Sequence, residues 1–340
     1  MNKPRILIIP ARRHIFESYC EYLIRYLGDE FYFEMGYPPE PAYYSSIKEH
    51  IWTNQTNPFH KNPDEFDLIW PQFPTHWFLE PPEKYASKIA IVMLEPRQNP
   101  RFPDKIAVWG TTNQALDKEY PNAHKLRFGV DTDLFRPFPQ ARLDDKVHVG
   151  FVGNIQTPRR YIKELFIDPL KDLEGIKLDI YPTSWLSHTR VDEIDRMGGQ
   201  DLIDNLVDGD KWLSGLPNIY NRMDIFVRCD IDHGYQFSVM EAAACAVPVV
   251  CTDSGPTKEI CDAGGGFCIK RGNGSWDKEN LDRIAKEIRE AVIFLRDNKE
   301  KREDMGLKGR REVFNNWRWD NFIEDWRKFF EEGVKNVKTN

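Results

Sequence analysis

The sequence predicts an α/β fold that consists of two doubly wound domains, each built on a parallel sheet. The 340 residues exceed the size at which a single hydrophobic core keeps growing. Short continuous apolar runs, typical of parallel strands buried on both faces, alternate with stretches whose apolar residues recur at helical spacing. Pro, Gly and Asp interrupt this pattern over residues 124–146, which is typical of a linker. We therefore place the domains at residues 1–138 and 146–317.

The first domain opens with the apolar run RILIIP at residues 5–10, which predicts a buried strand. The apolar residues of the next segment, IFESYCEYLIRYLG, recur at helical spacing and stop at Gly28, so this segment predicts a helix. A second strand is predicted by FYFEMGY at residues 31–37. Three later runs, which end at Pro or at a polar turn, predict the remaining strands: FDLIWPQF, KIAIVMLEP and KIAVWGTT, beginning at Phe66, Lys88 and Lys105.

The second domain repeats this design. It begins with VHVGFVGN at residues 147–154, which predicts a buried strand followed by a glycine, a loop and a helix. Residues 281–314 predict two charged amphipathic helices, and residues 318–336 predict a last helix rich in aromatic side chains. Four further apolar runs predict the other strands: KLDIYPTSW, MDIFVRCD, VPVVCTD and GFCIKRG, beginning at Lys177, Met223, Val247 and Gly266.

Charge and cysteine content argue against several classes of function. The net charge of −7 is opposite to that of a typical nucleic-acid-binding protein, so we expect no nucleic-acid partner. The first apolar run is too short for a secretory signal, and no segment has the roughly 18 apolar residues of a membrane helix, so we expect a cytoplasmic protein. The six cysteines lack the spacing of a zinc site, and we expect reduced thiols and no bound metal.

The turns that follow the strands of the second domain are the candidate binding segments, because ligands of open α/β sheets bind beyond the carboxyl ends of the strands. The first such turn is GNIQTPRR, from Gly153 to Arg160. Its adjacent arginines, Arg159 and Arg160, stand near a helix N-terminus, where cations are electrostatically unfavourable. A bound anion would compensate them, so we expect these arginines to bind phosphate oxygens.

The second turn, CDIDHGYQFSVMEA at residues 229–242, carries a carboxylate with two interpretations. Gly234 allows a tight turn, and Ser238 is expected to begin a helix whose free amides face the ligand. Ser238 and Glu241 match the S-x-x-E capping box, in which Glu241 only bonds the amide of Ser238. Alternatively, Glu241 holds a substrate, and the local pattern leaves both interpretations open. The third turn, TDSGPTKE at residues 252–259, offers further amides at the same edge.

Two segments of the chain carry motifs of a known enzyme family. Residues 128–137, FGVDTDLFRP, match an interdomain motif N-G-V-D-x-x-x-F-x-P, and the span from Pro217 to Glu259 follows E-G-F-G-x-x-x-x-E-A-x-A-x-G-x-P-V-V and G-G-x-x-E. Through these motifs the C-terminal two thirds of the chain resemble the family-four glycosyltransferases, which are retaining enzymes of the GT-B fold. The resemblance implies two Rossmann-like doubly wound parallel-sheet domains, an interdomain cleft, and a C-terminal helix, residues 318–336, that crosses back to the first domain.

The resemblance also implies a donor site in the second domain. Glu241 corresponds to the second glutamate of the family's E-x7-E motif, which bonds the ribose hydroxyls of a sugar nucleotide. Arg159, assisted by Asn154 or Arg160, takes the place of the basic pair that neutralises the leaving diphosphate. His233 stands at the position of the family's first glutamate, which contacts the donor sugar. Backbone groups of the same turns complete the implied site: Gly153, Gly234, Tyr235, Gln236, Phe237 and Ser238.

The first domain is implied to bind the acceptor. We expect Glu95, which ends one predicted strand, and Trp109 and Thr111, in the next, to point toward the cleft. The acceptor is a carbohydrate, a lipid or a small molecule, and peripheral contact with a membrane stays open. The resemblance implies that no metal or other cofactor is required, because arginine, lysine and helix amides carry the charge that develops on the leaving group.

The sequence thus predicts a cytoplasmic, metal-independent, retaining glycosyltransferase that resembles hexosyltransferases and moves a sugar from a nucleoside-diphosphate sugar to an acceptor hydroxyl. Two alternatives stay open, because His233 and Asn154 replace a glutamate and an arginine of the family pattern. One is a non-catalytic subunit that binds a nucleotide sugar or serves as a scaffold. The other is a sugar-nucleotide epimerase of the GT-B fold. The pattern leaves the base, the sugar, the acceptor and the oligomeric state undetermined.

Overall fold

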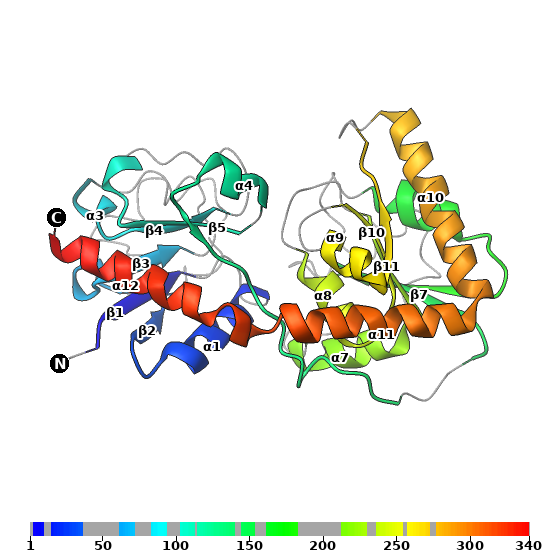
Figure 1. Cartoon of the computed structure of the whole chain (residues 1–340), viewed down its shortest axis with the longest axis horizontal. Helices are drawn as coiled ribbons and strands as arrows, with labels where there is room; N and C mark the ends of the chain where they lie inside the picture. Colours follow the sequence, from blue (N-terminus) through cyan, green and yellow to red (C-terminus); the bar gives the residue numbers. More distant parts are fainter. Residues whose placement is uncertain are drawn as a thin grey trace. The chain divides into compact units, whose positions relative to one another are not determined.

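The chain forms two compact units in a computed structural model (Figure 1). The first unit spans Met1–Gly129 and Trp319–Asn340, and the second spans Val130–Arg318. The sequence placed the end of the first domain at residue 138, whereas Val130 already pairs with the second unit, donating its N–H to the carbonyl of Trp317 at 2.8 Å. The structure describes residues 3–9, 15–36, 61–71, 83–93, 103–112, 114–139, 144–153, 161–182, 212–229, 236–253, 257–272 and 277–339.

The first unit contains parallel strands in the orders β2-β1-β3 and β4-β5-β6. A parallel bridge between Ile69 and Ile89 connects β3 to the residue that precedes β4, so the two sheets continue into one another. The sequence missed β6, because its two residues lie in the segment interpreted as a linker and are too few to show a period. The strands are β1 (Arg5–Ile9), β2 (Tyr32–Met35), β3 (Leu68–Pro71), β4 (Ala90–Met93), β5 (Val108–Thr111) and β6 (His124–Lys125).

The C-terminal helix α12 (Ile323–Thr339), red in Figure 1, packs on the strands of the first unit. Gly333 allows this close approach, since a Cβ there would lie 2.9 Å from side-chain atoms of Leu68 and Val108. The helix begins later than the predicted residue 318, because Trp319–Asn321 form a 3-10 turn. The other helical segments of this unit are α1 (Ile15–Leu27), α3 (Glu83–Ala86), α4 (Gln114–Glu119) and two 3-10 turns, Pro63–Glu65 and Pro103–Lys105.

Aromatic side chains hold α12 in place. The rings of Trp326 and Phe330 lie 5.0 Å and 5.7 Å from the ring of Trp70 on β3, in tilted and edge-on arrangements. The indole N–H of Trp326 donates to the carbonyl of Arg127 at 2.8 Å. Edge-on and tilted aromatic pairs add stability beyond the area that they bury. The aromatic residues of the last predicted helix therefore form part of the core of the first unit.

The second unit is built on one parallel sheet of order β11-β10-β9-β7-β8. Numbered from its own first strand, this sheet has the order 5-4-3-1-2, and the strands of the first unit follow the same rule with β2-β1-β3. The first and third strands, here β7 and β9, are therefore neighbours. The strands are β7 (Val147–Gly153), β8 (Ile176–Pro182), β9 (Ile225–Arg228), β10 (Val249–Thr252) and β11 (Gly266–Ile269).

Helix α11 packs directly on α8 in the second unit. Gly306 makes this contact possible, since a Cβ there would collide with the carbonyl oxygen of Ala246 just beyond α8. None of the helices in the described part of the chain is long and apolar enough to span a membrane. The helical segments of the unit are α5 (Asp168–Leu170), α7 (Trp212–Arg222), α8 (Phe237–Ala244), α9 (Thr257–Ile260), α10 (Lys278–Asp297), α11 (Lys299–Asn316) and two π-helical turns, Lys163–Ile167 and Cys261–Gly265.

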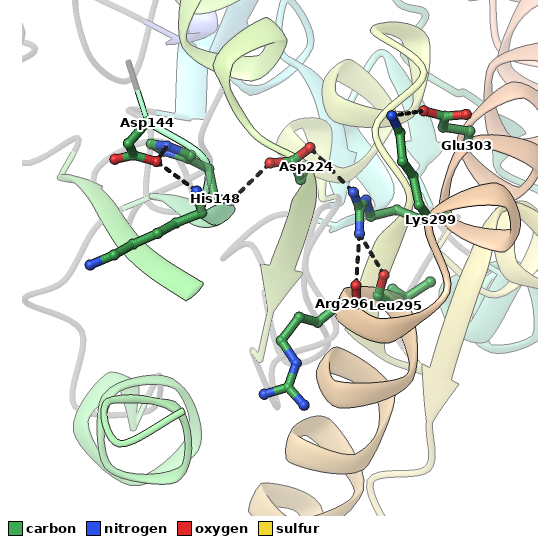
Figure 2. A network of polar contacts seen from close by, with 9 residues as sticks. Asp144, His148, Asp224, Leu295, Arg296, Lys299 and Glu303 are labelled. Atoms are coloured by element: carbon green, nitrogen blue, oxygen red, sulfur yellow. Dashed lines mark hydrogen bonds and ion pairs between the residues drawn. The ribbon is translucent and has the colours of Figure 1, made fainter. Parts of the chain in front are cut away.

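A polar network lies at the amino edge of this sheet, where β7 and β9 begin. His148 on β7 is buried, and its Nδ1 lies 2.7 Å from the carboxylate of Asp179 on β8. Its Nε2 lies 3.1 Å from Asp144, and its backbone N–H donates to Asp224 at 2.9 Å. Figure 2 shows His148 between Asp144 and Asp224. These contacts connect β7 to both of its neighbouring strands.

The same network extends to α10 and α11 through Arg302. This buried arginine donates to the carbonyl of Leu295 at 2.7 Å and to that of Arg296 at 3.2 Å, near the end of α10. Its guanidinium also lies 3.8 Å from the carboxylate of Asp224. The charged groups of this amino-edge network thus have partners within the protein.

Candidate active site

The carboxyl edge of the second sheet presents a topological switch point. In open α/β sheets the ligand-binding crevice forms where the first and third strands are neighbours, outside their carboxyl ends. Here that point lies between β7, which ends at Gly153, and β9, which ends at Arg228. The neighbouring strand β10 ends at Thr252. The predicted donor residues of the second domain follow these strand ends in sequence.

Arg228 places a positive charge at the switch point. Its side chain is only 7% exposed, and its Nη1 donates to the carbonyl of Val152 at 2.7 Å. The guanidinium also lies 5.5 Å from the ring centre of Phe151, within cation–π range. Both contacts come from β7, so the end of β9 is tied to the end of β7 by a charged group.

Helix α8 begins at Phe237, with Gln236 as its N-cap residue. A capping box requires Ser238 at the N-cap, so that prediction is wrong by two positions. The side chain of the N-cap residue Gln236 makes no capping hydrogen bond, and Glu241 lies too far along the helix to bond the amide of Gln236. Gln236 is buried, whereas Phe237 and Ser238 keep part of their surface exposed. The capping interpretation of Glu241 is thus excluded by the start of the helix.

The Glu241 carboxylate bonds a tyrosine instead. The hydroxyl of Tyr220 on α7 donates to Glu241 Oε2 at 2.7 Å, and the Tyr220 side chain is fully buried. The ring of Tyr220 packs edge-on against Phe135 and Phe226, at centroid distances of 6.0 Å and 5.8 Å. The other carboxylate oxygen, Oε1, has no hydrogen-bond partner among the residues that the structure describes. Glu241 is therefore oriented by the protein and keeps one acceptor oxygen.

The environment of this carboxylate raises its pKa. Desolvation within the surrounding protein moves the pKa of Glu241 from 4.5 to about 7, although the hydrogen bond from Tyr220 and the charge of Arg228 act in the opposite direction. Burial, and then the neighbouring Glu241 carboxylate, raise the pKa of the Tyr220 phenol well above its usual value. Tyr220 consequently stays a hydrogen-bond donor, and Glu241 changes its charge close to neutral pH. Strongly shifted groups of this kind cluster at functional sites.

The described residues account for part of the predicted site. Gly153 ends β7, and Glu241 and the first residues of α8 follow β9. Six predicted donor residues and one predicted acceptor residue lie outside the described residues: Asn154, Arg159, Arg160, His233, Gly234, Tyr235 and Glu95. Their roles remain predictions. Among the described residues, no cluster of His, Cys, Asp or Glu has the arrangement of a metal site.

The two described acceptor-side residues have contacts within the first unit. Thr111 is fully buried, and its hydroxyl donates to the carboxylate of Asp117 at 2.6 Å. Trp109 is partly buried, and its ring stacks on Tyr120 with centroids 6.3 Å apart and an interplanar angle of 7°. Their contact with an acceptor remains a prediction.

Sequence reasoning overlooked Tyr220 and Arg228. An arginine inside the apolar run MDIFVRCD is a detectable signal, because a charge in a buried parallel strand needs a local partner. Tyr220 carries no such signal. It is one of several apolar or aromatic residues on α7, and only the packing of α7 against α8 brings its hydroxyl to Glu241.

Residues 146–292, most of the second unit, match a family model described as glycosyl transferases group 1. Sucrose-phosphate synthase from Thermosynechococcus elongatus has a similar structure, with a TM-score of 0.74 at 12% identity over 97% of this chain and 99% of that one. HepE from Anabaena, solved with UDP and glucose, gives 0.67 at 13% over 97% and 100%. A glycosyltransferase from Rickettsia africae gives 0.63 at 14% over 99% and 100%. No curated protein matches the sequence. The predicted family resemblance and GT-B fold are confirmed.

Proposed function

We propose that this glycosyltransferase of the GT-B fold moves a sugar from a nucleoside-diphosphate sugar to an acceptor hydroxyl, with retention of configuration and without a metal ion. The observation that carries the proposal is the state of Glu241. Its carboxylate accepts a hydrogen bond from Tyr220, lies on the helix that follows β9 at the switch point, and has no partner for Oε1 among the described residues. A carboxylate in this state suits a ligand that offers hydroxyl groups.

The donor proposal follows from what such a carboxylate can bind. An ionised carboxylate only accepts hydrogen bonds, and two neighbouring ribose hydroxyls are donors that match it. The side chain of the N-cap residue Gln236 does not cap the first amides of α8, and helix N-termini bind the oxygens of phosphate groups. Ribose hydroxyls and phosphates occur together in a sugar nucleotide. Support for this class of donor also comes from HepE, which has the same fold and was solved in complex with UDP-glucose.

Chemistry at the donor requires stabilisation of a leaving diphosphate. We assign this role to Arg159, assisted by Arg160 or Asn154, and to the amides of α8, because preorganised donors stabilise developing negative charge. The acceptor hydroxyl attacks on the face from which the diphosphate departs, which retains the configuration. His233 contacts the donor sugar in this proposal. Arg159 and His233 keep the roles that the family resemblance implies.

A ligand screen followed by a turnover assay tests the proposal. Uridine, guanosine and adenosine diphosphate sugars are compared by thermal shift, since a ligand that binds only the native state raises the melting temperature. The best donor is then incubated with a pool of carbohydrate, lipid and small-molecule acceptors, and the products are followed by NMR. We expect transfer to an acceptor or slow donor hydrolysis with release of the nucleoside diphosphate. Binding without turnover would identify a non-catalytic subunit, and a changed sugar on an intact nucleotide would identify an epimerase.

The Glu241→Gln variant tests the carboxylate directly. Losing a charge-assisted ribose bond should weaken sugar-nucleotide binding by about 1–3 kcal/mol, or roughly 5- to 150-fold. Calorimetry at about pH 8 measures this loss while most of the wild-type carboxylate is ionised. Glu290→Gln, on the exposed face of α10, is the matched control and should bind like the wild type. An unchanged affinity of Glu241→Gln would remove Glu241 from the donor site.

A further inference from the structure

The second unit begins with an irregular segment, residues 130–138, which we call the entry segment. Its first N–H, from Val130, donates to the carbonyl of Trp317 at 2.8 Å. The Asp131 carboxylate then accepts two N–H groups of the turn that follows it, at 2.9 Å and 3.0 Å. The entry segment is therefore ordered by specific hydrogen bonds, although it forms neither a helix nor a regular strand.

Asn221, near the end of α7, binds the backbone of the entry segment. Its Oδ1 accepts the N–H of Phe138 at 2.9 Å, and its Nδ2 donates to the carbonyl of Arg136 at 3.0 Å. The same Nδ2 donates to the carbonyl of Pro217, one turn earlier in α7, at 2.8 Å. The amide thus uses its oxygen and both of its N–H groups, which fixes its orientation. Asn221 ties the entry segment to the turn of α7 that also carries Tyr220.

Tyr220 contacts the entry segment and the donor-site carboxylate with different parts of its side chain. Its ring packs edge-on against Phe135, with centroids 6.0 Å apart, and its hydroxyl donates to Glu241 Oε2 at 2.7 Å. Both Phe135 and Tyr220 are buried. Because protein interiors are close-packed, a shift of the Phe135 ring displaces the phenol that orients Glu241. One side chain thus connects the entry segment to the carboxylate.

Arg310 on α11 provides a second connection. Its Nη1 donates to the carbonyl of Phe135 at 3.3 Å and to the carbonyl of Ala244, the last residue of α8. Helix α8 carries Glu241, so the guanidinium ties the entry segment to that helix as well. The two helices that bring Tyr220 and Glu241 together are therefore both bound to the same short segment.

We infer that the entry segment positions the donor-site carboxylate, with Phe135 and Asn221 as positioning residues that hold Tyr220 against Glu241. The inference rests on the proposed function, and it needs no contact between these residues and the donor. Coupling between two sites is reciprocal in free energy, so binding at Glu241 should in turn order the entry segment. Donor binding should slow hydrogen exchange in residues 130–138, and a change at Phe135 should weaken donor binding.

Hydrogen exchange tests this coupling in the full chain without any substitution. Exchange is followed by mass spectrometry at about pH 8, above the pKa of about 7 of Glu241, at labelling times short enough to report local opening. The probes are UDP-glucose, GDP-glucose and ADP-glucose. We expect a donor that binds to slow exchange in residues 130–138 about fivefold, the lower end of coupling between sites. Residues 144–148, where the N–H groups of Lys146 and His148 donate to aspartate side chains at 2.9 Å, are the matched control and should exchange at an unchanged rate.

A double-mutant cycle tests whether the coupling passes through Tyr220. Phe135→Leu should weaken binding of the same donor by about two- to tenfold, the contribution of one aromatic contact. Tyr220→Phe keeps the ring but removes the hydrogen bond to Glu241, so Phe135→Leu should have little further effect in that background. Tyr220→Phe should also abolish the donor-dependent protection of the entry segment.

Phe166→Leu is the matched control for lost packing. Phe166 is a fully buried ring on the π-helical turn Lys163–Ile167, and it packs against Phe151 with centroids 5.9 Å apart. Its substitution should lower the melting temperature, as Phe135→Leu does, because both remove part of a buried ring. Donor affinity should fall in Phe135→Leu and stay at the wild-type value in Phe166→Leu.

The outcomes separate the inference from the proposed function. Unchanged exchange of residues 130–138 in a wild type that binds a sugar nucleotide would overturn the inference alone, and this comparison does not depend on the folding of a variant. An unchanged donor affinity of Phe135→Leu, or equal effects of Phe135→Leu in the wild-type and Tyr220→Phe backgrounds, would also overturn it. If the wild type binds none of the three sugar nucleotides, the proposed function fails, and the inference fails with it.

Discussion

The two edges of the second sheet use charge in opposite ways. At the amino edge, Asp224 accepts the backbone N–H of His148 and faces the guanidinium of Arg302, and Arg302 donates to the carbonyl of Leu295. At the carboxyl edge, Glu241 accepts one hydrogen bond from Tyr220, its Oε1 has no partner among the described residues, and its pKa is raised by desolvation. The comparison teaches that the amino edge stabilises the unit, while the carboxyl edge retains an unfavourable carboxylate that a ligand can use.

The topology explains why the two edges differ. In a parallel sheet all strands end on one side, and the helices that follow begin there with free amides. Ligands bind at this side, so a group such as Glu241 can be completed by a molecule from solution. At the other side, the chain returns from each helix into the next strand. Arg302, a charged residue on that side, donates to backbone carbonyls at the end of α10.

The largest expected effect concerns the amino edge. Arg302→Met removes a buried guanidinium that donates to two carbonyls and faces the Asp224 carboxylate, so the free energy of unfolding should fall by about 3 kcal/mol. Urea unfolding followed by circular dichroism measures this change. Sugar-nucleotide affinity of the folded variant should stay at the wild-type value. A loss below about 0.5 kcal/mol, typical of surface substitutions, would contradict the contrast between the edges.

At the carboxyl edge we expect a gain in stability from Glu241→Gln. The pKa of Glu241 is raised from 4.5 to about 7 on folding, so the native state binds the proton more tightly than the unfolded chain. Ionisation therefore lowers the stability of the wild type as the pH rises from about 4.5 to 7, and the full loss is present above pH 7. The glutamine variant avoids this loss and should be more stable by about 2 kcal/mol at pH 8.

Urea unfolding of both proteins at two pH values checks this prediction. Most of the difference should vanish near pH 5, where the folded carboxyl group is protonated. Opposite changes in stability and in donor affinity for the same variant would mark a residue kept for function at the expense of stability. A glutamine variant less stable than the wild type at pH 8 would instead indicate that the carboxylate stabilises the fold.

The smallest effects concern the packing that supports α8, which carries Glu241. Gly306→Ala should destabilise the unit by about 1–2 kcal/mol, because its Cβ would collide with the backbone carbonyl of Ala246. Gly309→Ala, one turn further along α11, is the matched control. Its Cβ would lie 3.3 Å from Gly265, and the gain in helix propensity should offset the tighter contact. Thermal unfolding of the two variants gives the comparison, and equal losses would show that both glycines are needed for close approach.

Sequence reasoning succeeded where a local pattern carries the information. Continuous apolar runs such as MDIFVRCD correctly indicated buried parallel strands, and the spacing of aromatic residues after Trp319 correctly indicated a final helix. Sequence reasoning failed where one pattern is compatible with two local structures. Ser238 and Glu241 satisfy the spacing of a capping box, but the helix begins at Phe237 and that spacing is not used.

By itself the sequence predicted a two-domain α/β fold and a resemblance to glycosyltransferases, because these depend on periodicity and on motifs that are local in the chain. Only the tertiary structure decided which partner and which surroundings Glu241 has. Its hydrogen-bond partner, Tyr220, comes from α7, and its pKa is raised by burial, neither of which sequence spacing encodes. Glu241 is a candidate for donor binding because the surrounding protein desolvates its carboxylate, while Oε1 has no hydrogen-bond partner among the described residues.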